Sequence, residues 1–483
     1  MKQTIQKLTQ TTGVLLSLML GMSQPAQAVI DGITGPTFNL TAKAGYISTA
    51  DGGSMFTWGF ANADVTPVTM QYPGPTLIVN QGDTVTVNLT NNLPLPVSII
   101  FPGQSNVSVT AGIENQPGTV TREASIGGSV TYSFVATEPG TYMYHSASMQ
   151  AMQVEMGLAG ALIVRPSGTA DPLHHAYSHP DTHFDYEYLF LLSEMDLAMH
   201  KAVEKASLPG GILYKLQGLG NQLMQFKKEN PSLDPPATLA GDVAALTQQV
   251  LAGEVADFSS PNPTLWFING RNGPDTLLEP NVAWLPNQPY NCVPRMHPGT
   301  KLLMRVVSVG RDMHPFHTHG NNTWLIARDG RMLESAPGMG PDLAMSNYTI
   351  QTAPGETYDA TYEWTGKGLN WDIYGHNPGD PMEANEYAPD HGKPFPELSA
   401  GVSLSLPNVL DLNEGQFYSG SPFLGSSIAR RPGQADNNQF GGYFHMWHSH
   451  NEKELTNDDI FPGGMMTLVV IEPNVVDIPV ASY

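Results

Sequence analysis

Cysteine is almost absent from this chain, and basic residues are scarce. One cysteine in 483 residues cannot form a disulfide within the chain, nor supply the ligands of an iron–sulfur cluster or a zinc finger. Only 22 Lys and Arg face 44 Asp and Glu, which gives a formal net charge of −22. A surface of this sign repels phosphate backbones, so nucleic acid is excluded as a partner.

Long hydrophobic runs are also missing. No segment reaches about 18 uninterrupted apolar residues, the length of a membrane-spanning helix, so no membrane partner is expected. Residues 1–28 are instead typical of a secretory signal, because Lys2 and Lys7 precede a short apolar stretch and residues 26–28 (AQA) form a small-residue cleavage site. We therefore predict a periplasmic or secreted protein.

Glycine (48) and proline (40) are abundant, and they separate short runs in which apolar and polar residues alternate. Residues 84–89 and 130–134 are examples, and the pattern resumes after residue 265. This period of two predicts β-sandwiches. Between the two β regions, residues 196–256 contain leucines at helical spacing and predict a helical insertion, which we expect to pack on the second sandwich. The predicted division is a signal peptide (1–28), a first domain (29–166), a His-rich linker (167–184), a second domain (185–475) and a tail (476–483).

Three stretches concentrate histidine at strand ends: residues 140–147 (GTYMYHSA), 314–320 (HPFHTHG) and 445–450 (HMWHSH). On a strand, His-x-His places both imidazoles on the same face. Two such pairs facing each other supply four nitrogen ligands, a set that suits copper, zinc or iron. The alternative is that these histidines are hydrogen-bonded core or rim residues that bind no metal.

These motifs resemble the multicopper oxidases, a family of cupredoxin β-sandwiches. The resemblance covers residues 70–166 and 265–473, and the segments 73–76 (PGPT) and 268–271 (INGR) fit it. It implies an all-β fold with two cupredoxin-like Greek-key sandwich domains and the helical insertion in the second. It also implies one to three copper ions, O₂ and a small molecule or metal ion as substrates, and a homotrimer with metal between neighbouring subunits.

The family's metal ligands carry over unevenly. The resemblance assigns to the copper cluster five histidines, namely His145, His317, His319, His448 and His450. Three further cluster histidines are missing, because Ala147 takes one position and the apolar residues 99–101 take the other two. At the family's blue copper site, His314 and Met465 match two ligands, but Ser449 stands in place of the cysteine and Glu454 near the second histidine. A blue site needs a thiolate, so we expect none here.

Two functions remain open from the sequence. One is an exported copper-binding homologue that oxidises a small substrate or metal ion with O₂ at a reduced histidine site. The other is a non-catalytic copper-binding, storage or copper-free scaffold protein. Weaker candidates are a surface metal site in the linker and a Cu(I)-binding methionine face around His145. The linker site would use His174, His175, His179 and His183 with Asp171, Asp181 and Asp185, and the methionine face Met143, Met149, Met152 and Met156. Their alternatives are a solvated linker and ordinary core packing. We expect Cys292 to be an inert thiol.

Overall fold

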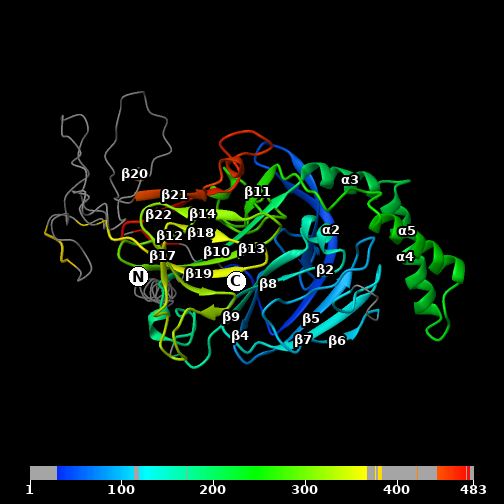
Figure 1. The fold of residues 1–483 in the computed structure, drawn as a ribbon, viewed down its shortest axis with the longest axis horizontal. Coiled ribbons are helices and arrows are strands. Elements are labelled where there is room, and N and C mark those ends of the chain that lie inside the picture. The colour runs from blue at the N-terminus through cyan, green and yellow to red at the C-terminus, as the bar shows by residue number, and fades with distance from the viewer. Residues whose placement is uncertain are drawn as a thin grey trace, which may run out of the picture.

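The computed structural model describes residues 30–113, 119–169, 171–366, 376, 379–382, 421–422, 443–474 and 476–478. Their strands form four sheets that pair into two β-sandwiches, with a helical arm on one side (Figure 1). The fold is of the predicted all-β class, with two β-sandwiches. The predicted signal peptide lies outside the described residues.

The first sandwich joins a four-stranded and a five-stranded sheet. The strands of the smaller sheet are, in order, β1 (Ile33–Thr34), β4 (Leu77–Asn80), β9 (Ala159–Arg165) and β8 (Gly140–His145). Those of the larger are β3 (Ser54–Asn62), β2 (Thr37–Ser48), β5 (Thr84–Asn91), β7 (Ser129–Val135) and β6 (Ser108–Ala111). The predicted alternation is present in β5, where Val85, Val87 and Leu89 enter the core and the residues between them are more exposed.

The second sandwich joins a seven-stranded and a six-stranded sheet. The seven-stranded sheet contains β11 (Leu265–Ile268), β10 (Tyr186–Met195), β13 (Lys301–Ser308), β19 (Thr357–Glu363), β15 (Thr323–Arg328) and β16 (Arg331–Met332), with β17 (Met345–Asn347) on β15. The six-stranded sheet contains β12 (Arg295–Met296), β22 (Met466–Ile471), β21 (Tyr443–Ser449), β14 (His314–Thr318) and β18 (Thr349–Thr352), with β20 (Ser421–Pro422) on β21. This second sheet carries two of the three histidine stretches, in β14 and β21.

The two sandwiches meet through an apolar layer and a buried ionic network. Residues of β8 and β9 pack against residues of β10 and β13 in one apolar cluster. Beside it, Glu187 accepts hydrogen bonds from Arg165 and, at 2.8 Å, from Arg305 Nε. Arg305 also donates to Thr141, whose hydroxyl donates to Asp359 at 2.5 Å. Because these charges are buried, the interface is held in one arrangement by mutually dependent contacts.

The helical insertion comprises α3 (Leu197–Ser207), α4 (Ile212–Glu229) and α5 (Ala237–Leu251), and it follows β10 in the chain. Asp196 caps α3 by accepting hydrogen bonds from two backbone N–H groups. The prediction that these helices pack on the second sandwich is wrong. Val203, Leu213 and Leu216 belong to the core of the first sandwich, and Figure 1 shows the helices on that side. The sequence did not reveal on which sandwich the insertion packs. Apolar periodicity indicates which face of a helix is buried, but not which part of the protein covers that face.

Candidate metal centre

Two neighbouring strands position the main histidine cluster. β14 and β21 are antiparallel, and their register places His317 directly opposite His448. His319 and His450 each follow two residues later, just beyond the ends of the strands. The sheet therefore brings the two His-x-His motifs together, although about 130 residues separate them in the chain.

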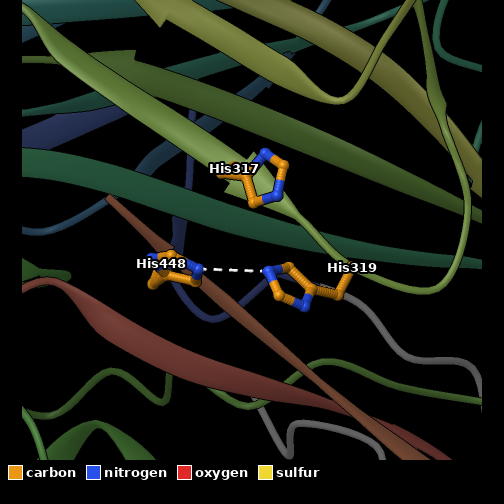
Figure 2. Close-up of side chains that lie close together, drawn as sticks. All are labelled: His317, His319 and His448. Carbon is orange, nitrogen blue, oxygen red and sulfur yellow. Dashed lines mark hydrogen bonds between the residues drawn. The ribbon is translucent and has the colours of Figure 1, made fainter. Parts of the chain in front are cut away.

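The imidazoles of His317, His319 and His448 converge, as Figure 2 shows. Their ligand nitrogens lie within 4.8 Å of one another. The Nε2 atoms of His319 and His448 are 3.2 Å apart. The exposed His450 adds a fourth ring, whose centroid lies 4.8 Å from that of His317. We call these four residues the histidine cluster.

The two buried histidines of the cluster, His317 and His448, are held in place and are neutral at neutral pH. His448 Nδ1 lies 2.7 Å from the carbonyl oxygen of Ser449, so Nδ1 carries the proton and Nε2 the lone pair. His317 Nδ1 is likewise 2.8 Å from the hydroxyl of Thr349. Burial and the adjacent imidazoles lower the pKa of His317 to about 4, and burial lowers that of His448. Neutral imidazoles oriented through their second nitrogen are the usual state of metal ligands.

His145 lies at the end of β8, in the first sandwich, and is not part of the gathered group of three. Its Nδ1 lies 3.0 Å from the carbonyl oxygen of Ser146, the same arrangement as in His448. Burial lowers its pKa. The segment beside His145 is the apolar run 99–101, and Ile100 in this run exchanges both backbone hydrogen bonds with His145. His145 thus has the orientation and protonation state of a ligand.

A different arrangement surrounds His314. This fully buried imidazole lies between two carboxylates, with Nδ1 3.0 Å from Glu454 and Nε2 3.0 Å from Glu194. Burial by itself lowers the pKa of His314, but the hydrogen bonds to Glu194 and Glu454 outweigh burial and raise it to about 9. His314 is therefore an imidazolium that donates from both ring nitrogens at neutral pH.

Ser449 and Met465 complete this second group. The Ser449 hydroxyl donates to the same Glu454 oxygen at 2.6 Å. The buried Met465 is linked to both neighbours through the backbone, donating to the carbonyl oxygen of Glu454 and accepting from the N–H of Ser449. The four positions that the resemblance assigned to blue copper therefore do lie together, and a hydrogen-bonded ion pair occupies them.

Comparison with known proteins identifies what the first sandwich is similar to. A multicopper oxidase family model matches residues 54–169, which include most of the first sandwich and His145. This part of the chain is therefore similar to a multicopper oxidase domain. The single cysteine of the chain, Cys292, lies outside every metal motif.

The curated relatives match over short stretches. Multicopper oxidase MCE of Talaromyces pinophilus is 36% identical over 96 residues, which is 20% of this chain and 15% of the relative. L-ascorbate oxidase of Cucumis sativus is 33% identical over 136 residues, or 28% of this chain and 21% of the relative. The chain thus spans about a fifth of the length of these relatives.

Solved structures resemble the chain over a longer span. The multicopper oxidase mgLAC covers 92% of this chain and 87% of its own, with 19% identity and a TM-score of 0.49. A blue copper oxidase from Nitrosomonas europaea covers 91% of this chain and 86% of its own, with 17% identity and a TM-score of 0.48. The similarity to the multicopper oxidase family model is confined to residues 54–169.

The two copper positions of a multicopper oxidase fit this chain differently. The histidine cluster offers neutral imidazole nitrogens, a donor set that suits copper. The blue copper position offers a serine hydroxyl in place of a thiolate and a carboxylate in place of the second imidazole. Its histidine nitrogens are both committed as donors, so a blue copper ion does not fit there. Without a thiolate, this position cannot form the copper–thiolate bond of a blue copper site.

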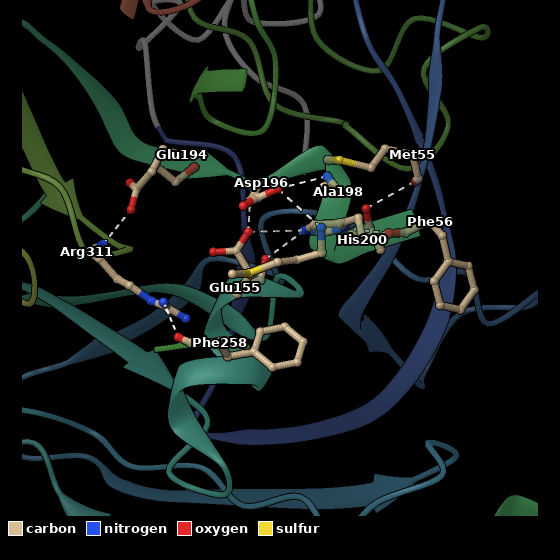
Figure 3. A network of polar contacts seen from close by, with 12 residues as sticks. Met55, Phe56, Glu155, Glu194, Asp196, Ala198, His200, Phe258 and Arg311 are labelled. Carbon is tan, nitrogen blue, oxygen red and sulfur yellow. Dashed lines mark hydrogen bonds and ion pairs between the residues drawn. The ribbon is translucent and has the colours of Figure 1, made fainter. Parts of the chain in front are cut away.

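A buried network that the sequence did not predict extends from Glu194, the partner of His314, toward the helical insertion (Figure 3). Glu194, at the end of β10, accepts from the backbone N–H of Arg311. The guanidinium of Arg311 donates to the carbonyl oxygens of Phe258 and of Ala151, in α2 (Gln150–Glu155). One available signal was Glu194 itself, a charged residue near the end of an otherwise apolar strand.

The network continues at the far end of α2, where Glu155 accepts at 2.7 Å from the N–H of Asp196, the cap of α3. Burial raises the pKa of Glu155 to about 8. His200 places its ring nitrogens against the carbonyl oxygens of Phe56 and Glu155, at 2.6 and 3.0 Å. These contacts fasten the insertion to the first sandwich.

Two weaker candidates have ordinary structural explanations. Met143, Met152 and Met156 are buried in apolar clusters, so they pack as core residues rather than form a copper face. Cys292 is buried, and its thiol donates to the carbonyl oxygen of Ile268. Burial raises the pKa of this thiol to about 12, which agrees with the expected inert thiol.

Proposed function

We propose that this multicopper oxidase homologue binds copper at the histidine cluster and oxidises a small molecule or a metal ion with O₂. The observation that carries the proposal is the convergence of three imidazoles whose ligand nitrogens lie within 4.8 Å. Two of them are neutral and oriented through Nδ1, so little energy is needed to organise the site. Copper held there would supply one-electron redox chemistry.

The chain's own residues define how such a site is reached. His317 and His448 are buried and anchored, so they form the fixed part of the site. His319 is half-buried and His450 is exposed, which leaves one side of the cluster open to solvent. We propose that a small substrate or an anion approaches from this side.

We further propose that a second subunit completes the site in a homotrimer. His145 has the ligand-like Nδ1 anchor but is not gathered with the triad of its own chain. In the family resemblance, its position ligates copper together with residues equivalent to the cluster. His145 of a neighbouring subunit is accordingly the proposed additional ligand. Sedimentation of copper-loaded protein tests this, and a monomer that retains full copper content contradicts it.

The buried ion pair at His314 favours a second candidate, a copper-binding or storage protein without turnover, or a copper-free scaffold. Without a thiolate site, electrons from a substrate have no route through the family's usual entry point. In this case the cluster would hold copper without reducing O₂, or the sandwich would serve as a binding surface.

One set of measurements separates these functions. Mature protein is loaded with Cu²⁺, dialysed and assayed for copper content and for O₂ consumption with a phenol and with Fe²⁺. Bound copper that His317→Ala removes, together with O₂ consumption that falls in the same variant, is expected. Bound copper without O₂ consumption supports storage. No specific copper binding contradicts the metal proposals and supports the scaffold.

Export is proposed from the predicted signal at residues 1–28. Within the described part of the chain, no helix has the length and apolar character needed to cross a membrane. N-terminal sequencing of the protein from its native compartment is expected to begin at Val29. Retention of Lys2 or Lys7 contradicts cleavage.

A further inference from the structure

The segment that connects β9 to β10 contains a second group of histidines. His175 and His183 face each other across an antiparallel bridge, and their ring centroids lie 5.5 Å apart. The ring of His174 lies 6.2 Å from that of His183. Three imidazoles from one short segment are therefore neighbours, and they belong to a different part of the fold from the histidine cluster.

Two of these histidines are oriented as metal-binding histidines are. His174 Nδ1 lies 2.5 Å from the carboxylate of Asp171, and His175 Nδ1 lies 2.9 Å from the carbonyl oxygen of the same residue. Both partners are acceptors, so Nδ1 carries a proton in each ring and Nε2 is the nitrogen left to bind a metal. Histidines that bind a metal through one ring nitrogen usually donate the other ring N–H to a carboxylate or a backbone carbonyl.

The backbone that carries this group is rigid. Ala176, Tyr177 and Phe184 are buried against the second sandwich, together with Leu303 and Ile326. The Tyr177 hydroxyl donates to Asp359 at 2.6 Å, and backbone hydrogen bonds join Ala176 to Thr182 and Phe184 to His174. Fixed backbone positions lower the entropy lost when side chains gather around an ion.

The spacing of the rings is compatible with one ion. A metal–nitrogen bond of about 2.1 Å places the centroid of a bound imidazole roughly 3.2 Å from the metal, so two bound rings lie at most about 6.4 Å apart. The separations of 5.5 and 6.2 Å both meet this limit. The three ligand nitrogens are not gathered within 4.8 Å as in the histidine cluster. Binding therefore requires rotation of the side chains.

We propose that His174, His175 and His183 form a second metal site, which takes a divalent cation of the Cu²⁺ or Zn²⁺ class and is separate from the histidine cluster. Imidazole is a suitable ligand for both ions, and the acidic chain favours cations. Asp171 positions His174 and adds a negative charge beside the ion. A bound ion here would cross-link the segment that connects β9 of the first sandwich to β10 of the second.

His179 belongs to the same segment but not to the site. Its Nδ1 accepts a hydrogen bond from the N–H of Asp181, where it caps a short 3₁₀ turn (Pro180–Thr182). Its ring also packs against Gly340. His179 thus offers a matched control: a histidine of the same loop that is committed to another role.

The test uses the mature chain with the histidine cluster disabled by His317→Ala and His448→Ala. Equilibrium dialysis with Cu²⁺, and separately with Zn²⁺, measures the ions bound per chain. One ion is expected to remain in this background. His183→Ala is expected to remove it, whereas His179→Ala retains it. Asp171→Asn is expected to weaken binding by about 10- to 100-fold.

The outcomes are distinguishable from a folding defect. Thermal unfolding of the metal-free variants shows whether each one folds, and if His183→Ala does not, the exposed Asp171→Asn supplies the decisive comparison. No ion in the cluster-disabled background overturns the site. Equal binding by His183→Ala and His179→Ala overturns the assignment of its ligands. Retention of one ion class only, Cu²⁺ or Zn²⁺, identifies the preferred cation.

Discussion

The buried imidazolium at His314 predicts a specific loss of stability as the pH rises. Its pKa is about 9 in the folded chain and about 6.5 in an unfolded one. Because a tenfold change in proton affinity corresponds to about 1.4 kcal/mol, the raised pKa contributes roughly 3 kcal/mol to the free energy of unfolding. This contribution is fully present below about pH 6.5 and is lost as the pH rises through about 9.

The reference for this measurement is a triple variant, His314→Gln, Glu194→Gln and Glu454→Gln. It keeps hydrogen-bonding side chains at the three positions but removes the titrating imidazole and both carboxylates. Urea unfolding of the metal-free proteins is followed between about pH 6 and about pH 9.5. The wild-type advantage over the triple variant is expected to shrink by about 3 kcal/mol across this range. Titrations elsewhere in the chain affect both proteins and cancel.

A constant difference between the two proteins across that range would refute the reasoning. It would mean that His314 has the same charge in the folded and unfolded states, and that its two contacts are ordinary neutral hydrogen bonds. An increase of the wild-type advantage with pH would contradict the direction of the pKa shift itself. Metal must be removed first, since an ion that binds only the folded state adds its own stability.

Four further outcomes are expected. Glu187→Gln removes the carboxylate that two buried guanidinium groups share and should lower the free energy of unfolding by about 3 to 5 kcal/mol in urea titrations. Leu216→Ala should cost about 2 to 5 kcal/mol and make the insertion more sensitive to proteolysis, because this side chain is buried in the first sandwich. Glu155→Gln should raise stability at pH 7 by about 3 kcal/mol, since the burial that raises the pKa of this carboxyl penalises its ionised form, and the gain should vanish below about pH 4.5. Ser449→Cys alone should show no intense thiolate-to-copper absorption after copper loading, whereas adding Glu454→His should produce it; a strong band in the single variant would show that Glu454 can be displaced.

Much of the fold and of the site could be predicted because the signals are local. Alternation with a period of two, as in β5, follows from the geometry of a strand, so it predicted the β-sandwiches. The same geometry indicated that His317 and His319 act together, and that His448 and His450 do. The donor types followed from the residues alone, and so did the missing thiolate at Ser449.

Only the tertiary structure decided which of these groups meet. Pairing of β14 with β21 set His317 opposite His448, and no local pattern encodes that register. Glu194 reaches His314 from a strand 120 residues earlier in the chain, so the carboxylate pair that turns this histidine into an imidazolium could not be read from its neighbours. The helical insertion covers the first sandwich rather than the second for the same reason. Side-chain chemistry and periodicity are properties of short segments, whereas protonation state and packing partner depend on contacts that folding brings from far along the chain.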